Sequence, residues 1–278
     1  NQIIIATSEK ADSLMRNGAS WIRDLAVLVI DEIHLLNDVG RGPTLEMTIT
    51  KLRRSNSGLQ IIGLSATVAN SRELADWLDA ELVSSDWRPI ALKEGVICKG
   101  RLVFSDEERA LEAKKDEKKD ESIALVRDTL SQDAQILIFE NSRKNAEAAA
   151  IKLSNLIPPD PKAETLSESI LATGESETCH RLASCVSRGI AFHHAGLLPD
   201  QRRLVEQGFR ENRIKVIAST PTLAAGLNLP ARRVLIKSYR RYEYGSGMVP
   251  IPVIEYRQMA GRAGRPGLDP YGESFLMA

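Results

Sequence analysis

Short apolar runs alternate with longer stretches of helical character along most of this chain, and no other feature limits its fold as strongly. In the first third, predicted strands and helices take turns at residues 3–6, 8–18, 25–30, 42–55, 59–68 and 70–82. Strands that alternate with helices favour a parallel sheet, because a helical crossover is the usual connection between parallel strands. The chain is therefore predicted to have an α/β fold.

A second alternating series begins near Ser122. Predicted helices and strands follow one another at residues 122–132, 134–142, 143–157, 189–197, 214–221 and 232–239. Three prolines within residues 157–170 indicate a loop there. We find no repeat of fixed period, so the sequence predicts two α/β units in tandem rather than a solenoid.

The segment between the two series has a different texture. Residues 84–104 combine extended pieces with Pro89 and Gly100, which is typical of a connection between domains. The run at 106–122 is dense in charge and predicts a solvated helix or a mobile insert. We therefore expect a first domain, a linker with a charged insert, and a second domain over residues 1–95, 96–121 and 122–278.

Composition limits the classes of partner and the setting. The chain has 278 residues, of which 43% are hydrophobic, and its 37 basic and 37 acidic residues cancel. A neutral chain of this kind contacts nucleic acid only through local patches. Three cysteines are too few for a disulfide framework and indicate a reducing, intracellular setting. No apolar run approaches the ~20 residues that span a bilayer, and the first residues do not read as a signal peptide.

The stretch at 27–34, VLVIDEIH, places two carboxylates and a histidine directly after an apolar run. Four apolar residues in a row read as a strand that is buried on both faces. Asp31 and Glu32 then fall outside the carboxyl end of a strand, where ligands bind in open α/β sheets. An aspartate there can hold Mg²⁺ through water, and a neighbouring glutamate can deprotonate an attacking water. The alternative is a solvent-exposed helix cap.

Residues 258–267, QMAGRAGRPG, carry Arg262 and Arg265 three positions apart, so on a helix they would share a face. The small residues between them would leave that face unobstructed. Two guanidiniums together fit the triphosphate of a nucleotide, since arginine binds phosphate oxygens in a bidentate manner. The alternative is a basic surface helix.

Two further segments are weaker signals. Residues 63–70, GLSATVAN, close a predicted strand with small hydroxyl residues. Within 218–234, Thr220 offers a hydroxyl to a phosphodiester backbone, Gly226 permits close approach and Asn228 can reach a nucleotide. The alternative for the first segment is capping of helices by Ser and Thr, and for the second an ordinary strand-loop with turn residues. No G-x-x-x-x-G-K-[ST] loop occurs in the sequence, so nothing obvious cradles a β-phosphate.

Taken in order, these segments resemble the motifs of superfamily 2 helicases of the DExH-box kind. DEIH (31–34) is similar to motif II, SAT (65–67) to motif III and QMAGRAGR (258–265) to motif VI. Further matches, to motifs Ib and IV, the element after it and motif V, are ATSEKADSL (6–14), LIFENSRKNAE (137–147), FHHAGL (192–197) and IASTPTLAAGLNLP (217–230). The residues of these motifs are most similar to those of the Ski-like branch and, within it, to those of the archaeal DNA repair helicases that act on stalled replication forks.

The resemblance implies two tandem RecA-like parallel-sheet motor domains, of which the first is incomplete. A complete member of the family would begin earlier, with a phosphate-binding loop, and would continue past Ala278 with a winged helix and further helical domains. We therefore expect residues 1–95 to be the C-terminal part of the first motor domain.

The resemblance also implies roles for single residues. Asp31 would hold Mg²⁺, and Glu32 would stand beside it at the metal and act as the catalytic base. His34 would couple the nucleotide site to motif VI near Gln258, which would help to position the water. The remaining contacts to ATP, with both arginines at the γ-phosphate, would come from Gly226, Asn228, Arg262 and Arg265. The nucleic-acid strand would be contacted by Thr7, Ser8, Ser142, Arg143, His193 and Thr220.

Residues 236–256 contain a Gly-Ser-Gly sequence between two extended arms and read as a β-hairpin. Pro250 and Pro252 confine the return arm to an exposed edge. Related DNA helicases carry a strand-splitting hairpin between motifs V and VI, so we expect residues 239–253 to form such a wedge, with an aromatic residue stacked on the last base pair. Its contacts to nucleic acid are expected from Tyr239, Arg240, Arg241 and Tyr242. The alternative is an edge hairpin of the sheet.

Together these inferences favour the motor core of an ATP-dependent 3′–5′ DNA helicase that unwinds branched or forked DNA in replication-coupled repair and uses ATP and Mg²⁺. Two alternatives remain, an RNA helicase of the same branch and a nucleic-acid-binding module without turnover. Because the phosphate-binding loop is absent, we expect the chain alone to be inactive as an ATPase. The expected partners are single-stranded and forked DNA and replication or repair proteins, with no membrane. We expect a monomer in the cytoplasm, associated with the nucleoid if the source is prokaryotic.

Overall fold

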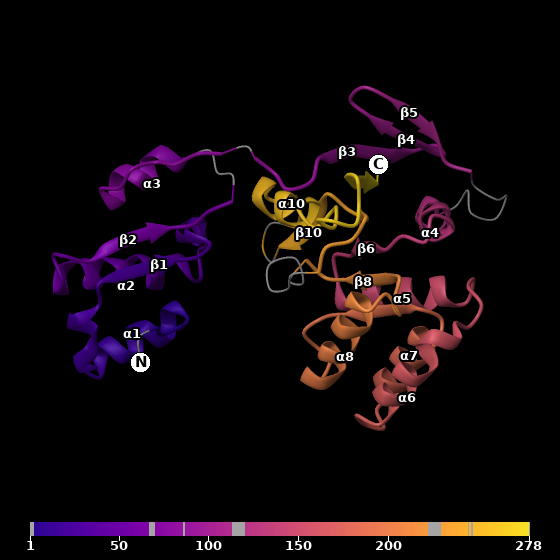
Figure 1. Ribbon diagram of the computed structural model, residues 1–278, viewed down its shortest axis with the longest axis horizontal. Helices are drawn as coiled ribbons and strands as arrows, with labels where there is room; N and C mark the ends of the chain where they lie inside the picture. Colours follow the sequence, from indigo (N-terminus) through magenta and orange to yellow (C-terminus); the bar gives the residue numbers. More distant parts are fainter. Residues whose placement is uncertain are drawn as a thin grey trace. The chain divides into compact units, whose positions relative to one another are not determined.

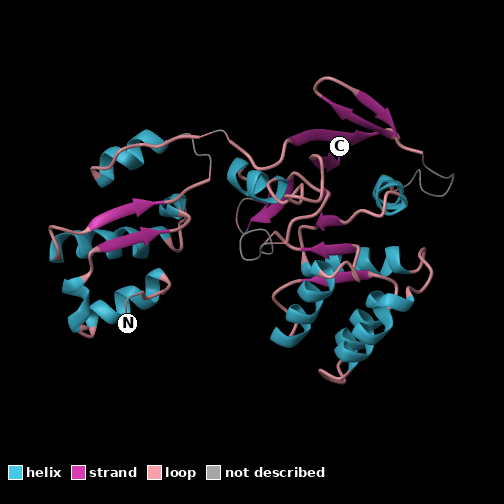
Figure 2. Cartoon of the chain, viewed as in Figure 1, coloured by secondary structure: helices cyan, strands magenta, loops and turns pink. Residues whose placement is uncertain are grey.

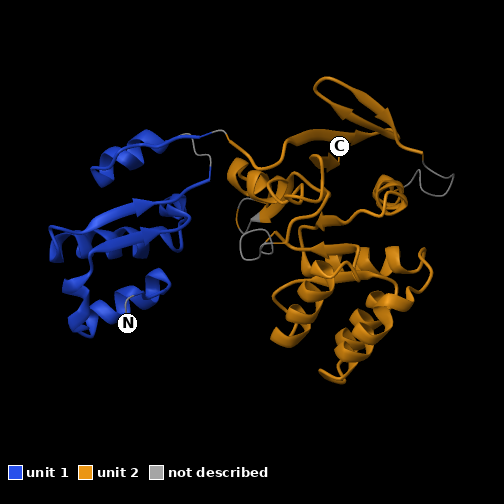
Figure 3. Cartoon of the chain, viewed as in Figure 1, with its two compact units in different colours: residues 1–86 blue, residues 87–278 orange. Residues whose placement is uncertain are grey.

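The computed structural model describes residues 3–66, 70–85, 87–112, 120–221, 229–243, 245 and 247–277. The chain divides into two compact units, residues 1–86 and residues 87–278 (Figure 3). Each unit has its own sheet and its own hydrophobic core. Helices and strands alternate in both units (Figure 2), and the larger sheet is mainly parallel, so the predicted α/β fold is confirmed. Among the described residues, no helix combines the length and the apolar character that crossing a membrane requires.

Unit 1 is built on two parallel strands. Strands β1 (Val27–Ile30) and β2 (Gln60–Gly63) pair with Leu28 opposite Ile61. The helical elements of this unit are α1 (Ser8–Arg16), η1 (Ser20–Asp24), η2 (Ile33–Asn37), α2 (Gly42–Ser55) and α3 (Ser71–Leu78). Pro43 lies in the first turn of α2, where a missing backbone N–H leaves no hydrogen bond unmade. Apart from the expected strand at residues 3–6, strands and helices follow one another in the order that the sequence predicts.

The core of unit 1 covers one face of its sheet. Ile30 packs with Ile33, Ile49 and Leu78, and Leu28 packs against this cluster. Successive side chains of a strand point to opposite faces, so the alternate residues of β1 face the other way. The side chains of Val27 and Val29 are 45% and 57% exposed. The prediction that β1 is buried on both faces is therefore wrong for the part of the chain that the structure describes, in which only one face carries helices.

The expected strand at residues 3–6 is absent from the described residues. Ile3 and Ile5 are 83% and 94% exposed, and no described strand pairs with them. A strand needs a partner for its backbone hydrogen bonds, and apolar character alone does not supply one. The helix that follows begins as predicted, but its cap is Thr7 rather than Ser8, since the Thr7 hydroxyl accepts a hydrogen bond from the backbone N–H of Lys10 at 3.2 Å.

Unit 2 contains a sheet of eight strands in the order β5-β4-β3-β12-β9-β6-β8-β7 (Figure 1). The strands are β3 (Leu92–Cys98), β4 (Arg101–Phe104), β5 (Glu108–Ala110), β6 (Ile136–Phe139), β7 (Ile190–His193), β8 (Val216–Ser219), β9 (Arg233–Ile236) and β12 (Gly272–Met277). The helices are α4 (Glu121–Ser131), α5 (Arg143–Ser154), η4 (Pro161–Ala163), α6 (Glu164–Leu171), α7 (Glu177–Val186), α8 (Pro199–Arg210) and α10 (Val253–Ala260). A separate antiparallel hairpin consists of β10 (Arg240–Glu243) and β11 (Gly247–Pro250).

Strands β6, β7, β8 and β9 are buried at every residue. Their sequences are nearly continuous apolar runs, as expected for parallel strands with both faces covered. Helix α5 packs on β7 and β8, and α7 packs on β7. Helices α5 to α8 gather around this end of the sheet, whereas β3 to β5 lie at the other end (Figure 1).

The structure differs from the expected linker. Strands β4 and β5 lie inside the segment 96–121, and β3 crosses its start, so these residues belong to the sheet of unit 2. Strand β3 pairs in parallel with β12, with Leu92 opposite Gly272. A pairing between strands from opposite ends of a unit leaves no local signal in the sequence, because its hydrogen bonds are made by backbone atoms.

The proline-rich segment at 157–170 also differs from the expected loop. Its prolines end with Pro161, the first residue of the short helix η4, and helix α6 follows directly. Leu166 and Ile170 are buried four positions apart on one face of α6, and this helical spacing was present in the sequence. The loop was expected because of the three prolines, but all three lie before helix α6 and do not interrupt it.

A buried ion cluster ties β12 to its neighbours in unit 2. The carboxylate of Glu273 is fully buried and accepts a hydrogen bond from the Nε of Arg233 at 2.7 Å. Arg109 of β5 pairs with the same carboxylate, and Arg233 also pairs with Asp128 of α4. Buried charges of this kind are stable only when every partner is present.

We predict that Glu273→Ala lowers the free energy of unfolding by about 3 to 5 kcal/mol, because it leaves buried guanidiniums without their carboxylate. Urea denaturation of the 278-residue chain measures this value. The matched control is Glu108→Ala, which removes a pair with Arg101 whose side chains are 52% and 64% exposed, and its expected cost is below about 1 kcal/mol. Equal costs for the two substitutions would contradict the structural role of the cluster.

Candidate nucleotide and nucleic-acid sites

Asp31 and Glu32 follow the carboxyl end of β1, as the sequence predicts. The backbone of Glu32 is left-handed, with φ 52° and ψ 44°, and its N–H donates to the Oδ1 of Asp31 at 2.9 Å. A residue with a side chain is uncommon in this region, and backbone strain of this kind clusters at active sites. The sequence carried no signal for this conformation, because glycine is the residue that usually marks it.

His34 connects the ends of the two strands of unit 1. Its ring is buried, with Nε2 3.2 Å from the Oε2 of Glu32 and Nδ1 3.3 Å from the Oγ of Ser65, which follows β2. Backbone hydrogen bonds run in parallel with this link, from Leu64 to Ile30 and from Ile33 to Leu64. Motifs II and III are therefore joined through one histidine within unit 1. The expected coupling of His34 to Gln258 involves both units and stays a prediction.

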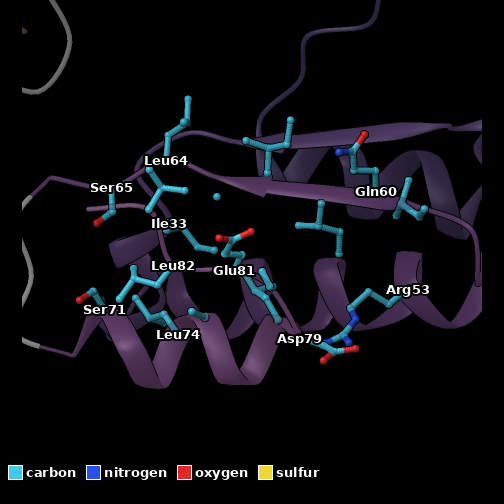
Figure 4. Close-up of a pocket in the computed structure, with 18 of the residues that line it drawn as sticks. Ile33, Arg53, Gln60, Leu64, Ser65, Ser71, Leu74, Asp79, Glu81 and Leu82 are labelled. Atoms are coloured by element: carbon cyan, nitrogen blue, oxygen red, sulfur yellow. The ribbon is translucent and has the colours of Figure 1, made fainter. Parts of the chain in front are cut away.

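A cavity of about 950 Å³ lies beside this link, between β2, α3 and residues 79–85. Figure 4 shows Ile33, Leu74 and Leu82 between the strand and the helix, with Ser65 at one end and Arg53 and Asp79 at the other. The guanidinium of Arg53 donates to the backbone carbonyl of Trp77 at 2.8 Å. Of the SAT motif, Thr67 lies outside the described residues.

The carboxylates of unit 1 fit a magnesium ion only in part. Among the described residues, no group of three or more His, Cys, Asp or Glu side chains is arranged to hold a metal ion. Mg²⁺ usually takes one or two protein carboxylates and completes its shell with water and substrate phosphates. Asp31 is exposed at the end of a strand and suits that limited role.

Arg262 and Arg265 do not lie on a helix, so the prediction that they share a helical face is wrong. Helix α10 ends at Ala260, and Gln258 occupies its last turn. The chain then joins the amino end of β9, where the N–H of Ala231 donates to the carbonyl of Arg262 at 2.9 Å and the N–H of Gly264 donates to the carbonyl of Ala231 at 2.7 Å. These two hydrogen bonds compete with continuation of the helix.

Two glycines permit this arrangement. Gly264 has φ +94°, and a Cβ added to Gly272 at the start of β12 would lie 2.3 Å from the backbone carbonyl of Ala263. The backbone of motif VI is thus pressed against the backbone of β12, an approach that a side chain would prevent.

The guanidinium of Arg265 is held inside unit 2. Its Nε and Nη2 donate to the two carboxylate oxygens of Asp269 at 2.8 Å each, and its Nη1 donates to the Oε1 of Gln135 at 2.8 Å. The side chain of Arg265 is 17% exposed and that of Asp269 is 5% exposed. The sequence analysis did not find Asp269, and its position four residues after an arginine in a turn was the only available signal.

The residues expected to contact nucleic acid in unit 2 meet at the opposite edge of the sheet. Ser142 and Arg143 follow β6, His193 ends β7 and Thr220 follows β8. These strands are parallel neighbours, so their carboxyl ends adjoin. Arg143 is exposed and Thr220 is half-buried, whereas Ser142 caps α5 by accepting a hydrogen bond from the N–H of Asn145 at 3.1 Å.

The structure buries His193, with its Nε2 3.2 Å from the Oε1 of Glu206 on α8. Burial lowers the pKa of His193, and the hydrogen bond to Glu206 opposes this only in part. The imidazole therefore faces helix α8 rather than solvent, and the exposed groups of this edge are its neighbours.

His194 is a residue of this edge that the sequence analysis missed. Its Nδ1 accepts a hydrogen bond from the N–H of Gly196 at 3.1 Å, so its Nε2 carries the proton and donates to Glu147 at 3.2 Å. The ring stacks on Phe192 with centroids 5.6 Å apart, and burial lowers the pKa of His194. The signal was the doublet of histidines before Ala-Gly, of which only the first was considered.

Four expected contacts remain, two to nucleic acid at the start of α1 and two to ATP. Thr7 and Ser8 start α1, where the Thr7 hydroxyl serves as the helix cap. Gly226 and Asn228 lie outside the described residues.

The predicted hairpin is confirmed. Strands β10 and β11 pair antiparallel, with Arg241 opposite Val249, and Gly245 and Gly247 have φ +84° and +75°. Tyr239 and Tyr242 are 47% and 71% exposed, so both rings are accessible from solvent.

Ion pairs and aromatic contacts fix the base of the hairpin. The guanidinium of Arg240 lies over the ring of Tyr239 at 5.3 Å, and Arg241 pairs with Glu255 of α10. The hairpin is therefore attached to the helix that leads to motif VI.

Comparison with known families agrees with this geometry. Residues 1–75 match the DEAD/DEAH box helicase family, and residues 117–267, more than half of the chain, match the helicase conserved C-terminal domain. The chain therefore belongs to the helicases with this conserved C-terminal domain. The two matches in tandem imply two RecA-like domains, as the resemblance in the sequence predicts.

Curated relatives narrow the class. The chain is similar to proteins named ATP-dependent DNA helicase Hel308 from Methanocella arvoryzae, Caldivirga maquilingensis and Pyrococcus horikoshii, with 54%, 49% and 44% identity over 99% of the chain. The chain spans 38%, 37% and 38% of the length of these relatives. The predicted resemblance to the archaeal DNA repair branch of superfamily 2 is confirmed.

The strained backbone at Glu32 gives a stability prediction. The free energy of unfolding of Glu32→Gly should be about 1 kcal/mol higher than that of Glu32→Gln. The left-handed region costs a residue with a side chain roughly 1–2 kcal/mol, whereas it costs glycine almost nothing. Urea denaturation of the 278-residue chain measures the difference. At Glu46 in helix α2, the same two substitutions should rank in the opposite order, because glycine weakens a helix interior. The same order at both positions would show that residue 32 is not strained.

Proposed function

We propose that this chain is the motor core of an ATP-dependent 3′–5′ DNA helicase that unwinds branched or forked DNA in replication-coupled repair. The observation that carries the proposal is the link from Glu32 through His34 to Ser65, at the carboxyl ends of two parallel strands, in a segment that matches DEAD/DEAH box helicases. If a nucleotide bound at motif II is to affect motif III, the two motifs must be in contact, and His34 provides this contact.

The substrate of the chemical step in this proposal is ATP. Glu32 acts as the base that takes a proton from the attacking water, and Gln258 helps to place that water. Asp31 holds Mg²⁺, which neutralises phosphate charge when it is bound. Gly226 and Asn228 contact the nucleotide, and Arg262 and Arg265 act on its γ-phosphate. These roles rest on the match of each residue to a family motif.

The nucleic-acid strand in this proposal runs along the carboxyl edge of β6, β7 and β8. Arg143 supplies charge, Ser142 and Thr220 supply hydroxyl groups, and His193 with His194 stiffens the loop beside them. In unit 1, Thr7 and Ser8 contribute at the start of α1. Contacts of this type do not need a basic coat, which agrees with the neutral net charge.

DNA is the preferred substrate in this proposal because the relatives are named DNA helicases. An RNA-unwinding relative of the same branch would share the motifs, and a fork assay with matched DNA and RNA duplexes separates the two. Single-stranded and forked DNA, replication or repair proteins, a monomeric state and a cytoplasmic location remain predictions from the sequence.

The proposed function predicts the effect of removing the Glu32 carboxylate on ATP hydrolysis. In the complete natural polypeptide that contains this sequence, Glu32→Gln should lower the DNA-stimulated rate of ATP hydrolysis by about 10² to 10⁴-fold, the usual contribution of a general base, and should leave ATP binding intact. Glu46→Gln on the exposed surface of α2 is the control and should have no effect. The 278-residue chain alone should hydrolyse ATP negligibly, since it has no phosphate-binding loop. DNA-stimulated hydrolysis that survives Glu32→Gln would refute the assignment.

The second prediction concerns the hairpin as a wedge. Tyr242→Ala should lower the rate of fork unwinding about tenfold, because stacking on a base contributes about 1–3 kcal/mol, and it should leave ATP hydrolysis within twofold. Tyr242→Phe keeps the ring and should unwind normally. Unchanged unwinding by Tyr242→Ala would make β10 and β11 an ordinary edge hairpin.

A further inference from the structure

Arg265 has a carboxylate partner of its own within motif VI. The backbone N–H of Arg265 donates to the Oδ2 of Asp269 at 2.9 Å, in addition to the two side-chain hydrogen bonds from its Nε and Nη2. The backbone N–H groups of Leu268 and Asp269 both donate to the carbonyl of Arg265 at 3.0 Å. Residues 265–269 thus form a closed turn in which the carboxylate and the guanidinium meet edge to edge, the most directional geometry that this pair of groups offers.

A second support comes from the buried side of the guanidinium. Gln135 is 3% exposed, and its Nε2 donates to the backbone carbonyls of Phe209 and Ile214 at 2.7 and 2.8 Å. These two hydrogen bonds fix the amide and direct its Oε1 at the Nη1 of Arg265. Because the amide is anchored to backbone on two sides, it cannot follow the guanidinium if the guanidinium moves.

The remaining hydrogen-bonding capacity of Arg265 decides what the arrangement can do. A guanidinium has five N–H groups. Asp269 and Gln135 accept from three of them, and the two that remain are both on the terminal nitrogens. Two N–H groups on terminal nitrogens are sufficient for a phosphate oxygen pair, whereas the Nε edge is committed to Asp269.

From this geometry we propose that Asp269 is a positioning residue for ATP hydrolysis, which with Gln135 holds the Arg265 guanidinium in one orientation and leaves two N–H groups for the γ-phosphate. This inference rests on the proposed function and adds to it the residues that orient one of its arginines. Asp269 does not touch the nucleotide. Its effect is on the rate of the chemical step, because a preoriented cation needs no reorganisation when charge develops on the phosphate.

The kinetic test uses the complete natural polypeptide with saturating single-stranded DNA. Asp269→Asn replaces an acceptor oxygen by an NH₂ group that faces donors, so it should lower kcat about 10- to 100-fold with KM for ATP unchanged within twofold, since misplacement of a catalytic group by about 1 Å costs up to 10²-fold. Asp269→Glu keeps the carboxylate and should recover most of the lost rate. Arg265→Lys should lower kcat more than Asp269→Asn does, because lysine lacks the planar guanidinium that binds phosphate through two N–H groups.

Asp128→Asn is the matched control. It removes a carboxylate that pairs with another arginine of unit 2, Arg233, whose side chain also pairs with Glu273 and, among the described residues, makes no ion pair or hydrogen bond with Asp269. It should lower thermal stability, because it weakens a pair with a buried guanidinium, and leave kcat unchanged. An equal loss of kcat in both variants would mean that Asp269 acts only through stability, and this would overturn the proposal.

A spectroscopic test does not depend on ATP hydrolysis. In the 278-residue chain labelled with ¹⁵N-arginine, the Nε–H signal of Arg265 should be protected from exchange with water, and this protection should disappear in Asp269→Asn and persist in Asp128→Asn. An unprotected signal in the unaltered chain would show that Asp269 does not hold the Arg265 guanidinium in one orientation, and this would overturn the proposal. Loss of protection without loss of kcat would overturn its role in hydrolysis and leave the helicase assignment standing. A complete polypeptide without DNA-stimulated ATP hydrolysis would instead refute the proposed function, and the positioning role of Asp269 would fall with it.

Discussion

Parallel pairing of short strands determines where the candidate functional groups at the strand ends of this protein lie. Strands that run in the same direction bring their carboxyl ends to one edge of a sheet and their amino ends to the other. In unit 1, the pairing of Ile30 with Gly63 puts the residues after both strands next to each other, so His34 reaches Ser65. In unit 2, the carboxyl edge of β6, β7 and β8 carries Arg143 and the histidine pair, whereas the arginines of motif VI lie by the amino ends of β6 and β9.

The sequence predicted the parts of this architecture that depend on local pattern. Apolar runs such as 136–139 and 216–219 became buried strands because continuous apolar character fits a strand with both faces covered. The hairpin around Gly245 was predictable because glycine alone adopts its positive φ without cost. The order of the motifs predicted the family, since several short matches in sequence are far more specific than any one of them.

The sequence did not predict features that arise from contacts between distant backbone segments. The arginines of motif VI were expected on a helix, but backbone hydrogen bonds to Ala231 divert the chain after Ala260. The left-handed backbone of Glu32 is held by the structure around it and has no signature in residue type. Apolar composition predicted a strand at residues 3–6, where no described partner exists. In motif VI a hydrogen bond to a distant segment overruled local propensity, and at residues 3–6 the described chain supplies no partner for the hydrogen bonds that a strand needs.

A small set of contacts connects the hairpin, helix α10 and motif VI in unit 2. Arg241 joins β10 to Glu255 in the first turn of α10, and two residues later on the same helix Arg257 donates to Glu94 of β3 at 2.9 Å. The helix ends where the backbone of motif VI is pressed against β12. Packed elements and ion pairs of this kind can carry energetic coupling between distant groups. The exposed tyrosines and Arg265 therefore lie on segments that α10 joins within unit 2.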